Sequence, residues 1–147
     1  MNNRCKTIIC DLDGTLCNVQ HRVEHAERGD FDTFHAALIQ DTPFAYIREM
    51  LQIYHGSGFE VIYLTGRPVR WLAQTEDWLR RHGVDFHAAI LMRANDDDRP
   101  DPEFKKEVYC NQLAGKEIAF ILEDRASVVR MWRSLGLNCL HVADGDF

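Results

Sequence analysis

Five short apolar segments recur along the chain, and each is typical of a buried strand. Their hydrophobicity is continuous rather than alternating, as expected for strands covered on both faces in a parallel sheet. Between them, three segments place apolar side chains on one helical face and end near glycine. The expected strands are 6–12, 59–65, 87–92, 117–122 and 137–142, and the expected helices are 44–54, 69–82 and 125–135.

This order of strands and helices predicts an α/β fold with a doubly wound, Rossmann-like, mostly parallel sheet of five strands. Ligands of such sheets bind outside the carboxyl ends of the strands. The first crossover is longer than the others by over 20 residues. We expect the surplus, residues 18–42, to form a small cap or flap over the site, with a short helix in "FDTFHAALI". The alternative is a surface loop without a role in function.

Composition narrows the class of protein. The 147 residues, 46% of them hydrophobic, suffice for one domain with a single core, so we expect 1–147 to be one domain. The apolar runs fall far short of the roughly 20 residues that cross a bilayer, and no signal-peptide pattern is present, which predicts a cytoplasmic protein without membrane contact. The net charge of −6 argues against a protein that coats nucleic acid through charge alone. It allows a protein that binds a single phosphorylated end.

The five cysteines form no CxxC pair and favour reduced side chains over a zinc site. The spacing of three histidines also fits no common ligand set, so they are expected to be surface or cap side chains. These are His21, His25 and His35.

The polar residues at the strand ends follow one chemical pattern. Asp11 and Asp13 come directly after the first strand, and burying such carboxylates is costly unless they are paired or bind a metal. Acids recur after the fourth strand, and oxygen ligands without nearby Cys or His favour Mg²⁺. A hydroxyl and several cations supply what a phosphoryl group needs. They are Thr65, Arg67, Arg93, Lys105 and Arg125.

Four short motifs at these ends resemble the signatures of the haloacid dehalogenase superfamily of phosphohydrolases. "DLDGTL" resembles the first, "YLTGR" the second, Lys105 the third and "ILEDR" the acidic fourth. A longer resemblance, to the bacteriophage-type phosphatase domains of polynucleotide kinase/phosphatases, covers nearly the whole chain. It rests on "DGTLCNVQHR", "MRANDDDRPDPEFKKE" and the closing "EDRASVVRMWRSLGLNCLHVADGDF". It implies removal of a 3′-phosphate from a DNA or RNA end, or from a nucleoside 3′-phosphate.

The resemblance implies a role for each site residue. Asp11 would be the nucleophile that forms an aspartyl phosphate, and Asp13 would protonate the leaving oxygen and then activate water. Asp11, the backbone carbonyl of Asp13 and Asp124 would hold Mg²⁺. Thr65 and Lys105 would bind the phosphoryl oxygens. Further matching positions, interpreted as substrate contacts or their supports, are Arg22, Arg67, Arg93, Asp101 and Arg125.

The chain departs from this pattern in two ways. Glu123 stands where the phage-type domain has aspartate, which argues against a direct role at the metal. No GxxxxGK[ST] loop occurs, so no 5′-kinase is expected on this chain.

Plainer interpretations exist for the same residues. Asp11 and Asp13 could be turn residues, and Thr65 could cap the helix that begins near Pro68. A helical lysine is often only solvated, and we choose Lys105 over its neighbour because Asp101 shares its helical face. Arg22 and Arg93 could be ordinary surface arginines.

Other functions also compete with a 3′-phosphatase of polynucleotide ends. The runner-up is a phosphatase for free nucleotides or another small phosphometabolite. A receiver-type signalling module also gathers acids, Thr and Lys, but it lacks a second acid in the position of Asp13. A catalytically dead relative that only binds is disfavoured because every motif carries competent chemistry.

Overall fold

A five-stranded parallel sheet forms the centre of the molecule. The computed structural model describes residues 4–145. The strand order is β5-β4-β1-β6-β7, and all neighbouring strands are parallel. β1 is therefore central, and the carboxyl ends of β4 and β6 lie on either side of its own. The strands are β1 (Lys6–Cys10), β4 (Glu60–Pro68), β5 (Ala89–Arg93), β6 (Glu117–Glu123) and β7 (Cys139–His141).

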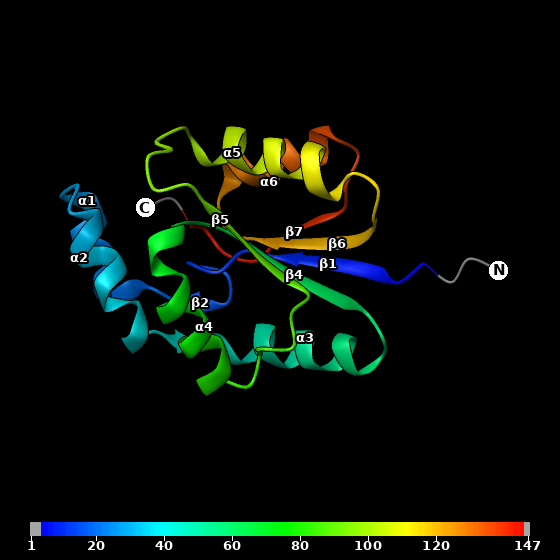
Figure 1. Cartoon of the computed structure of the whole chain (residues 1–147), viewed down its shortest axis with the longest axis horizontal. Coiled ribbons are helices and arrows are strands. Elements are labelled where there is room, and N and C mark those ends of the chain that lie inside the picture. The colour runs from blue at the N-terminus through cyan, green and yellow to red at the C-terminus, as the bar shows by residue number, and fades with distance from the viewer. Residues whose placement is uncertain (1–3, 146–147) are drawn as a thin grey trace.

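Helices cover both faces of this sheet, which confirms the doubly wound fold (Figure 1). Helices α3 and α4 pack on one face, and α5 and α6 pack on the other. Within β1, Ile8 belongs to the first core and Ile9 to the second. Both faces of the strand are thus buried, and this explains its continuous apolar run. The helices are α3 (Ala45–Gly56), α4 (Leu72–Arg81), α5 (Asp101–Val108) and α6 (Ala126–Ser134).

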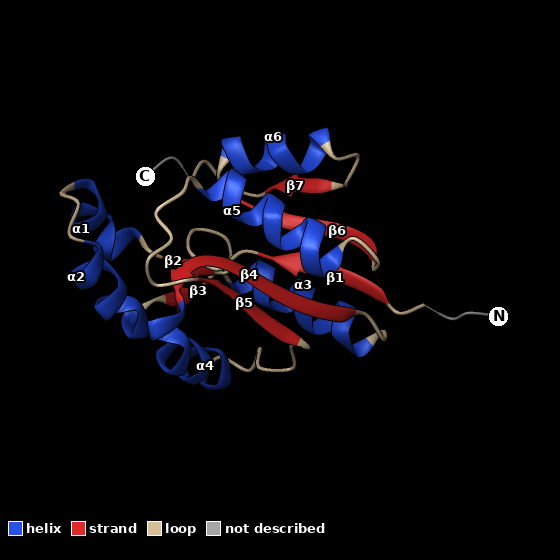
Figure 2. Cartoon of the chain, turned by 45° about the horizontal axis from the view of Figure 1, so that its top comes forward, coloured by secondary structure: helices blue, strands red, loops and turns tan. Residues whose placement is uncertain are grey.

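The surplus of the first crossover forms a cap beyond the carboxyl ends of the strands (Figure 1). Two short antiparallel strands, β2 and β3, pair with each other at the two ends of this cap segment (Figure 2). Asp30 caps α2 by accepting a hydrogen bond from the N–H of Thr33 at 3.1 Å. The cap elements are β2 (Cys17–Asn18), η1 (Gln20–Arg22), α1 (Val23–Glu27), α2 (Phe31–Ala36), η2 (Ala37–Gln40) and β3 (Thr42–Pro43).

The observed bounds differ from the expected ones at several ends. The first strand ends at Cys10 instead of residue 12, because the Leu12 carbonyl accepts N–H groups of the turn that follows. β4 continues to Pro68 through a register shift against β5. The helix expected over 69–82 begins with the 3₁₀ turn η3 (Val69–Trp71), and the π-helical turn η4 (Tyr109–Leu113) follows α5.

The small β2–β3 sheet was not expected from the sequence. The five cysteines are free thiols. Within residues 4–145, no helix is both long and apolar enough to span a membrane.

Candidate active site

Asp11 lies at the centre of the site, directly after the central strand. Its Oδ1 accepts a hydrogen bond from Lys105 Nζ at 2.8 Å, and its Oδ2 accepts one from Thr15 Oγ1 at 3.1 Å. Lys105 Nζ also donates to Glu123 Oε2 at 2.8 Å. The ammonium group of Lys105, on α5, therefore binds acids at the carboxyl ends of both β1 and β6.

Lys105 and its neighbour Lys106 have opposite environments. Lys105 is 1% exposed, whereas Lys106 is exposed. Burial alone would lower the pKa of Lys105, but the carboxylates of Asp11, Glu123 and Asp101 raise it well above its usual value. Lys105 is therefore firmly protonated beside Asp11.

Three buried acids gather around this lysine: the carboxylates of Asp11, Glu123 and Asp124 place oxygens within 4.8 Å of one another. Burial, then the charge of Glu123, raises the pKa of Asp11 to about 7, against the opposing effect of Lys105. Burial, then the charges of Asp11 and Glu123, raises the pKa of Asp124 to about 9. One ammonium group does not balance three carboxylates, so the cluster lacks positive charge.

The oxygens of Glu123 and Asp124 differ in their hydrogen bonds. Glu123 Oε2 accepts from Lys105, and Oε1 accepts from the backbone N–H groups of Asp124 and Arg125 at 3.2 and 3.3 Å. Asp124 Oδ2, in contrast, is buried without a hydrogen-bond partner among residues 4–145. A divalent cation with oxygen ligands would supply the missing charge and a partner for this atom, so the cluster fits Mg²⁺.

Two glycines pack against the Asp124 carboxylate. Gly14, in the left-handed region at φ +85°, leaves room where a Cβ would lie 2.1 Å from Asp124 Oδ2. Gly145 approaches the same oxygen, and a Cβ there would lie 1.6 Å away. Its N–H also donates to the Asp124 carbonyl at 3.1 Å, so the C-terminal segment helps to hold this acid. Asp146 and Phe147, which end the terminal "GDF", lie outside the described residues.

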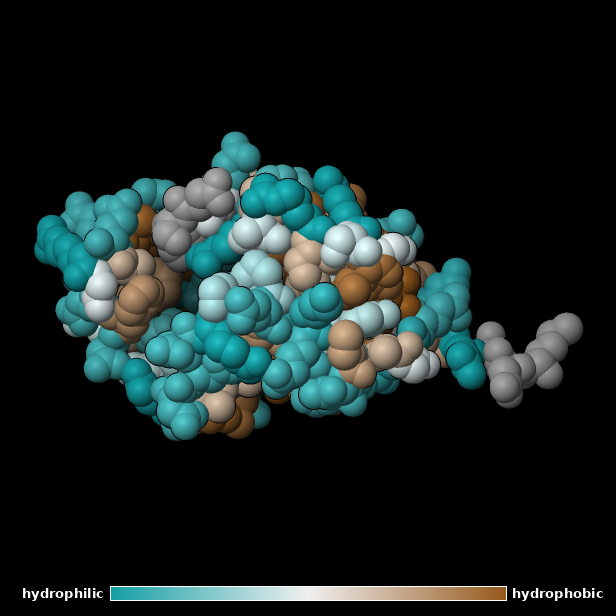
Figure 3. Space-filling model, turned by 90° about the horizontal axis from the view of Figure 1, so that it is seen from above, coloured by the Kyte–Doolittle hydropathy of each residue, from teal (hydrophilic) through white to brown (hydrophobic). Residues whose placement is uncertain are grey.

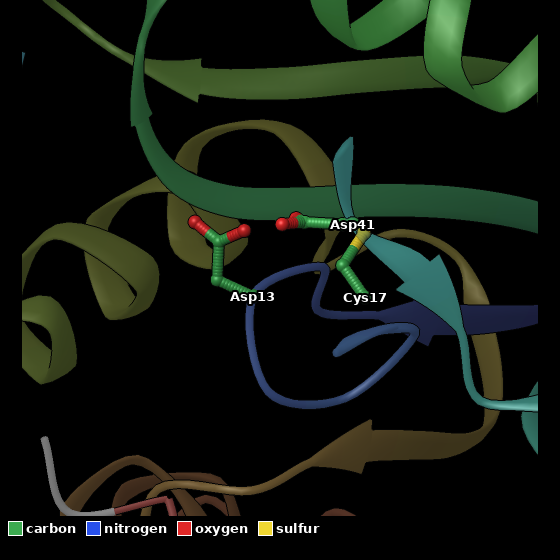
Figure 4. Close-up of side chains that lie close together, drawn as sticks. All are labelled: Asp13, Cys17 and Asp41. Atoms are coloured by element: carbon green, nitrogen blue, oxygen red, sulfur yellow. The ribbon is translucent and has the colours of Figure 1, made fainter. Parts of the chain in front are cut away.

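Asp13 belongs to a second group of charges. Figure 4 shows its carboxylate and that of Asp41 pointing toward each other, with Cys17 alongside. Arg22 Nη2 lies 2.6 Å from Asp13 Oδ1 and 2.7 Å from Asp41 Oδ2. Arg67 Nη2 lies 2.5 Å from Asp13 Oδ1 and 3.6 Å from Asp41 Oδ2. Burial would raise the pKa of Asp13, but Arg67 and Arg22 hold it well below its usual value.

Both of these arginines are fully buried, at 0% exposure. Arg22 also donates to the Phe34 carbonyl at 3.1 Å, and its guanidinium lies 4.1 Å from the Phe34 ring centre. Arg67 donates to Thr75 Oγ1 at 3.1 Å. Of the two interpretations predicted for Arg22 and Arg67, the structure therefore favours support of Asp13 over contact with substrate.

Asp41 was missed by the sequence analysis. Its side chain has no exposed surface, and its two oxygens accept from Arg22 Nε at 2.8 Å and Nη2 at 2.7 Å. His21 Nε2 lies 2.7 Å from Asp41 Oδ1, and the Asp41 carbonyl accepts from Trp78 Nε1 at 2.9 Å. No sequence pattern marks an aspartate at the end of the cap, because its partners come from distant elements.

The remaining predicted residues line the rim of the site. Asp101 pairs with Arg93, and its second oxygen lies 3.3 Å from Arg125 Nη1. Thr65 Oγ1 accepts from the N–H of Arg67 at 3.2 Å. Pro68 precedes the next helical turn without a side-chain cap, so Thr65 is not an N-cap.

Acids of both groups and the rim residues line one cavity of about 490 Å³. Figure 3 shows a hollow at the cap end of the molecule. Asp11, Asp13, Thr65 and Asp124 line the cavity at the strand ends, and cap residues line it on the other side. Within the described part of the chain, no histidine joins either group of acids that could hold a metal.

Known proteins resemble this chain in sequence and in fold. Residues 5–147 match the HAD_PNKP family model, the polynucleotide kinase PNKP phosphatase domain. A protein of Autographa californica nuclear polyhedrosis virus, named as a bifunctional polynucleotide kinase/RNA ligase, is 26% identical over 132 residues, which are 88% of this chain and 18% of that protein. A chain of the Pnkp1/Rnl/Hen1 RNA repair complex aligns with all of this chain and 45% of its own length, at 33% identity and a TM-score of 0.87.

The chain thus spans less than half the length of these two relatives. A hydrolase from Streptococcus pneumoniae TIGR4 is similar in fold over 97% of this chain and 95% of its own, with a TM-score of 0.64 and 12% identity. The family match covers the sheet, the cap and the acids at the strand ends, and it identifies a phosphoric monoester hydrolase. The chain belongs to the haloacid dehalogenase-type family of polynucleotide kinase phosphatase domains.

Proposed function

We propose that this chain is a Mg²⁺-dependent phosphohydrolase that removes the 3′-phosphate from polynucleotide ends or nucleoside 3′-phosphates through an aspartyl phosphate on Asp11. One observation carries the proposal. The Asp11 carboxylate faces a cavity between a buried lysine and a second acid, Asp13, that two arginines hold in place. This arrangement supplies a nucleophile, a positive charge and a proton-transfer group within one site.

In the first step, an Asp11 oxygen attacks phosphorus and the bond from phosphorus to the 3′-oxygen breaks. Asp13 donates its proton to the departing 3′-oxygen. Lys105 and the hydroxyl of Thr65 stabilise the charge on the transferring group. Asp11, the backbone carbonyl of Asp13 and Asp124 would hold Mg²⁺, which when bound neutralises the phosphoryl oxygens and the acids around them.

In the second step, Asp13 accepts a proton from water as the water oxygen attacks the aspartyl phosphate. The bond from phosphorus to Asp11 breaks, inorganic phosphate leaves and the free carboxylate returns. Arg22 and Arg67 keep Asp13 ionised at rest, which suits this role as a base. A phosphate dianion entering the cavity raises the proton affinity of Asp13 by like-charge repulsion, and this favours the protonated form that the first step uses.

The choice of polynucleotide ends is supported by the relatives, which are named for a polynucleotide kinase/RNA ligase and for an RNA repair complex. A cavity of about 490 Å³ also has room for a free nucleotide, so a nucleotide phosphatase is the second candidate. A receiver-type module is disfavoured, because Asp13 beside Asp11 favours rapid hydrolysis of a phosphoaspartate.

The test is a panel of initial rates with Mg²⁺ or with EDTA. The substrates are 3′- and 5′-phosphorylated oligonucleotides, nucleoside 3′- and 5′-monophosphates, and sugar phosphates. We expect the 3′-phosphorylated oligonucleotide to be the best substrate, EDTA to remove the activity, and Asp11→Asn to abolish it on all substrates. Sugar phosphates hydrolysed as fast or faster would overturn the nucleic-acid assignment.

A further inference from the structure

One wall of the cavity contributes nothing to the phosphoryl chemistry. The cap forms this wall with Ala26, Phe31, Phe34 and His35, and Pro68 of β4 lies beside them. Figure 3 shows apolar side chains next to the hollow at this end. The wall is apolar and aromatic, although the strand ends across the cavity are densely charged. A phosphate alone would leave this half of the cavity unused.

Phe31 is the exposed side chain of the wall. It is 56% exposed at the first position of α2, whereas Phe34 on the same helix is 3% exposed and packs under the Arg22 guanidinium. Phe34 therefore belongs to the core, and Phe31 does not. An aromatic ring left open at the mouth of a charged cavity offers a flat face for stacking.

His35 adds a polar atom to the same wall. It is 7% exposed, and its Nδ1 is buried with no hydrogen-bond partner in the part of the chain that the structure describes. Burial lowers its pKa to about 4, so the ring is neutral at pH 7. Its ring centre lies 5.1 Å from that of Phe34 and 6.1 Å from that of Trp71. The wall thus combines neutral aromatic surface with one unused hydrogen-bonding atom, as a heteroaromatic ligand requires.

We propose that this wall is a nucleoside subsite, in which Phe31 stacks on the base of the nucleotide whose 3′-phosphate faces Asp11, and His35 meets a polar edge of the nucleoside. This inference rests on the proposed function, because a 3′-phosphate bound at the strand ends would place the base of the same nucleotide opposite the cap. Base stacking tolerates every base, so the subsite recognises the class of substrate and not a sequence. A sugar phosphate has no flat face to place on the wall.

The test compares two substrates that differ only in the base, a nucleoside 3′-monophosphate and base-free ribose 3-phosphate. The enzymes are wild type, Phe31→Ala, Phe31→Tyr and Ile53→Ala, where Ile53 is a matched control that is 68% exposed on α3. Phe31→Ala should lower kcat/KM for the nucleotide about 5- to 100-fold and leave the base-free substrate unchanged. Phe31→Tyr and Ile53→Ala should behave as wild type.

Equal losses on both substrates, or no loss on the nucleotide, would overturn the subsite. If the wild type hydrolyses no 3′-phosphate, the proposed function fails, and adenosine binding then decides the subsite separately. Adenosine should shift the NMR resonances of the Phe31 ring in wild type, and Phe31→Ala should abolish adenosine binding. Shifts confined to other parts of the chain would reject the role of the cap wall.

Discussion

Two buried groups of charges lie at the carboxyl ends of the strands, and they differ in charge balance. The first, the Asp11 cluster, has three carboxylates and one ammonium group. The second, the Asp13 cluster, has two carboxylates and two guanidinium groups. The Asp11 cluster consists of Asp11, Glu123, Asp124 and Lys105, and the Asp13 cluster of Asp13, Asp41, Arg22 and Arg67.

The imbalance appears in the ionisation of the acids. The pKa of Asp11 rises to about 7 and that of Asp124 to about 9, whereas the pKa of Asp13 falls well below its usual value. Both clusters bring potential metal ligands within 4.8 Å of one another, the second one through Asp13, Cys17 and Asp41. The charge balance therefore indicates which of the two clusters binds a metal ion, because only the Asp11 cluster needs a further cation.

Removing the nucleophile of the Asp11 cluster has the largest expected effect. Asp11→Asn should lower the rate on a 3′-phosphorylated oligonucleotide by at least about 1,000-fold, because no aspartyl phosphate can form. The same variant removes one uncompensated charge, so without metal it should unfold at the same temperature as wild type or a higher one. A thermal scan in EDTA measures this, and a clear loss of stability would contradict the charge imbalance.

Removing a cation from the balanced Asp13 cluster should have the opposite effect on stability. Arg67→Ala leaves one guanidinium group, that of Arg22, for Asp13 and Asp41, and breaking such a buried pair costs about 3–5 kcal/mol. Urea unfolding of the metal-free protein measures the loss. Arg70→Ala is the matched control, because Arg70 forms an exposed ion pair with Asp32. A loss below about 1 kcal/mol for Arg67→Ala would show that the balance is unimportant.

Asp41 allows a finer test of the Asp13 cluster, because it acts on Asp13 only through Arg22 and Arg67. Asp41→Asn should slow hydrolysis of a nucleoside 3′-phosphate by about 10- to 100-fold, because Arg22 loses the carboxylate that orients it toward Asp13. Hydrolysis of p-nitrophenyl phosphate should suffer less, because p-nitrophenolate leaves without needing a proton. Asp77→Asn serves as the control, because Asp77 pairs only with the neighbouring helical arginines Arg80 and Arg81 among the ion pairs of the described residues. Equal slowing of both substrates would argue for a general structural defect.

The dependence of stability on pH and Mg²⁺ gives a further test of the charge imbalance. In the metal-free protein, Asp11 and Asp124 bind protons in the folded state up to about pH 7 and 9, but their unfolded forms lose them near pH 4. The folded state thus holds more protons in this window, so metal-free stability should fall as pH rises from about 4 to 9.

Mg²⁺ should reverse this loss, raising Tm by about 5 °C or more at pH 8 and by less at pH 5. Calorimetric scans in EDTA and in Mg²⁺ at both pH values measure the difference. The same Mg²⁺ effect at pH 5 and pH 8 would count against metal binding at the Asp11 cluster.

Much of the fold followed from local patterns in the sequence. Continuous apolar runs marked the five strands of the sheet, because strands buried on both faces have no solvent side to keep polar. The position of Asp11, Asp13 and Asp124 directly after strands then implied that they meet, because parallel strands end at one edge. The shared helical face of Asp101 and Lys105 indicated which of two lysines turns inward.

The sequence by itself therefore determined the order of the elements and which of them end at the site. Only the tertiary structure decided which charges are balanced. Asp41 gave no signal in the sequence, Arg22 and Arg93 could have been surface arginines although both are buried, and Gly145 gave no hint that it packs on Asp124. Periodicity is a local property of the chain, whereas compensation of a buried charge depends on the distances between elements far apart in it.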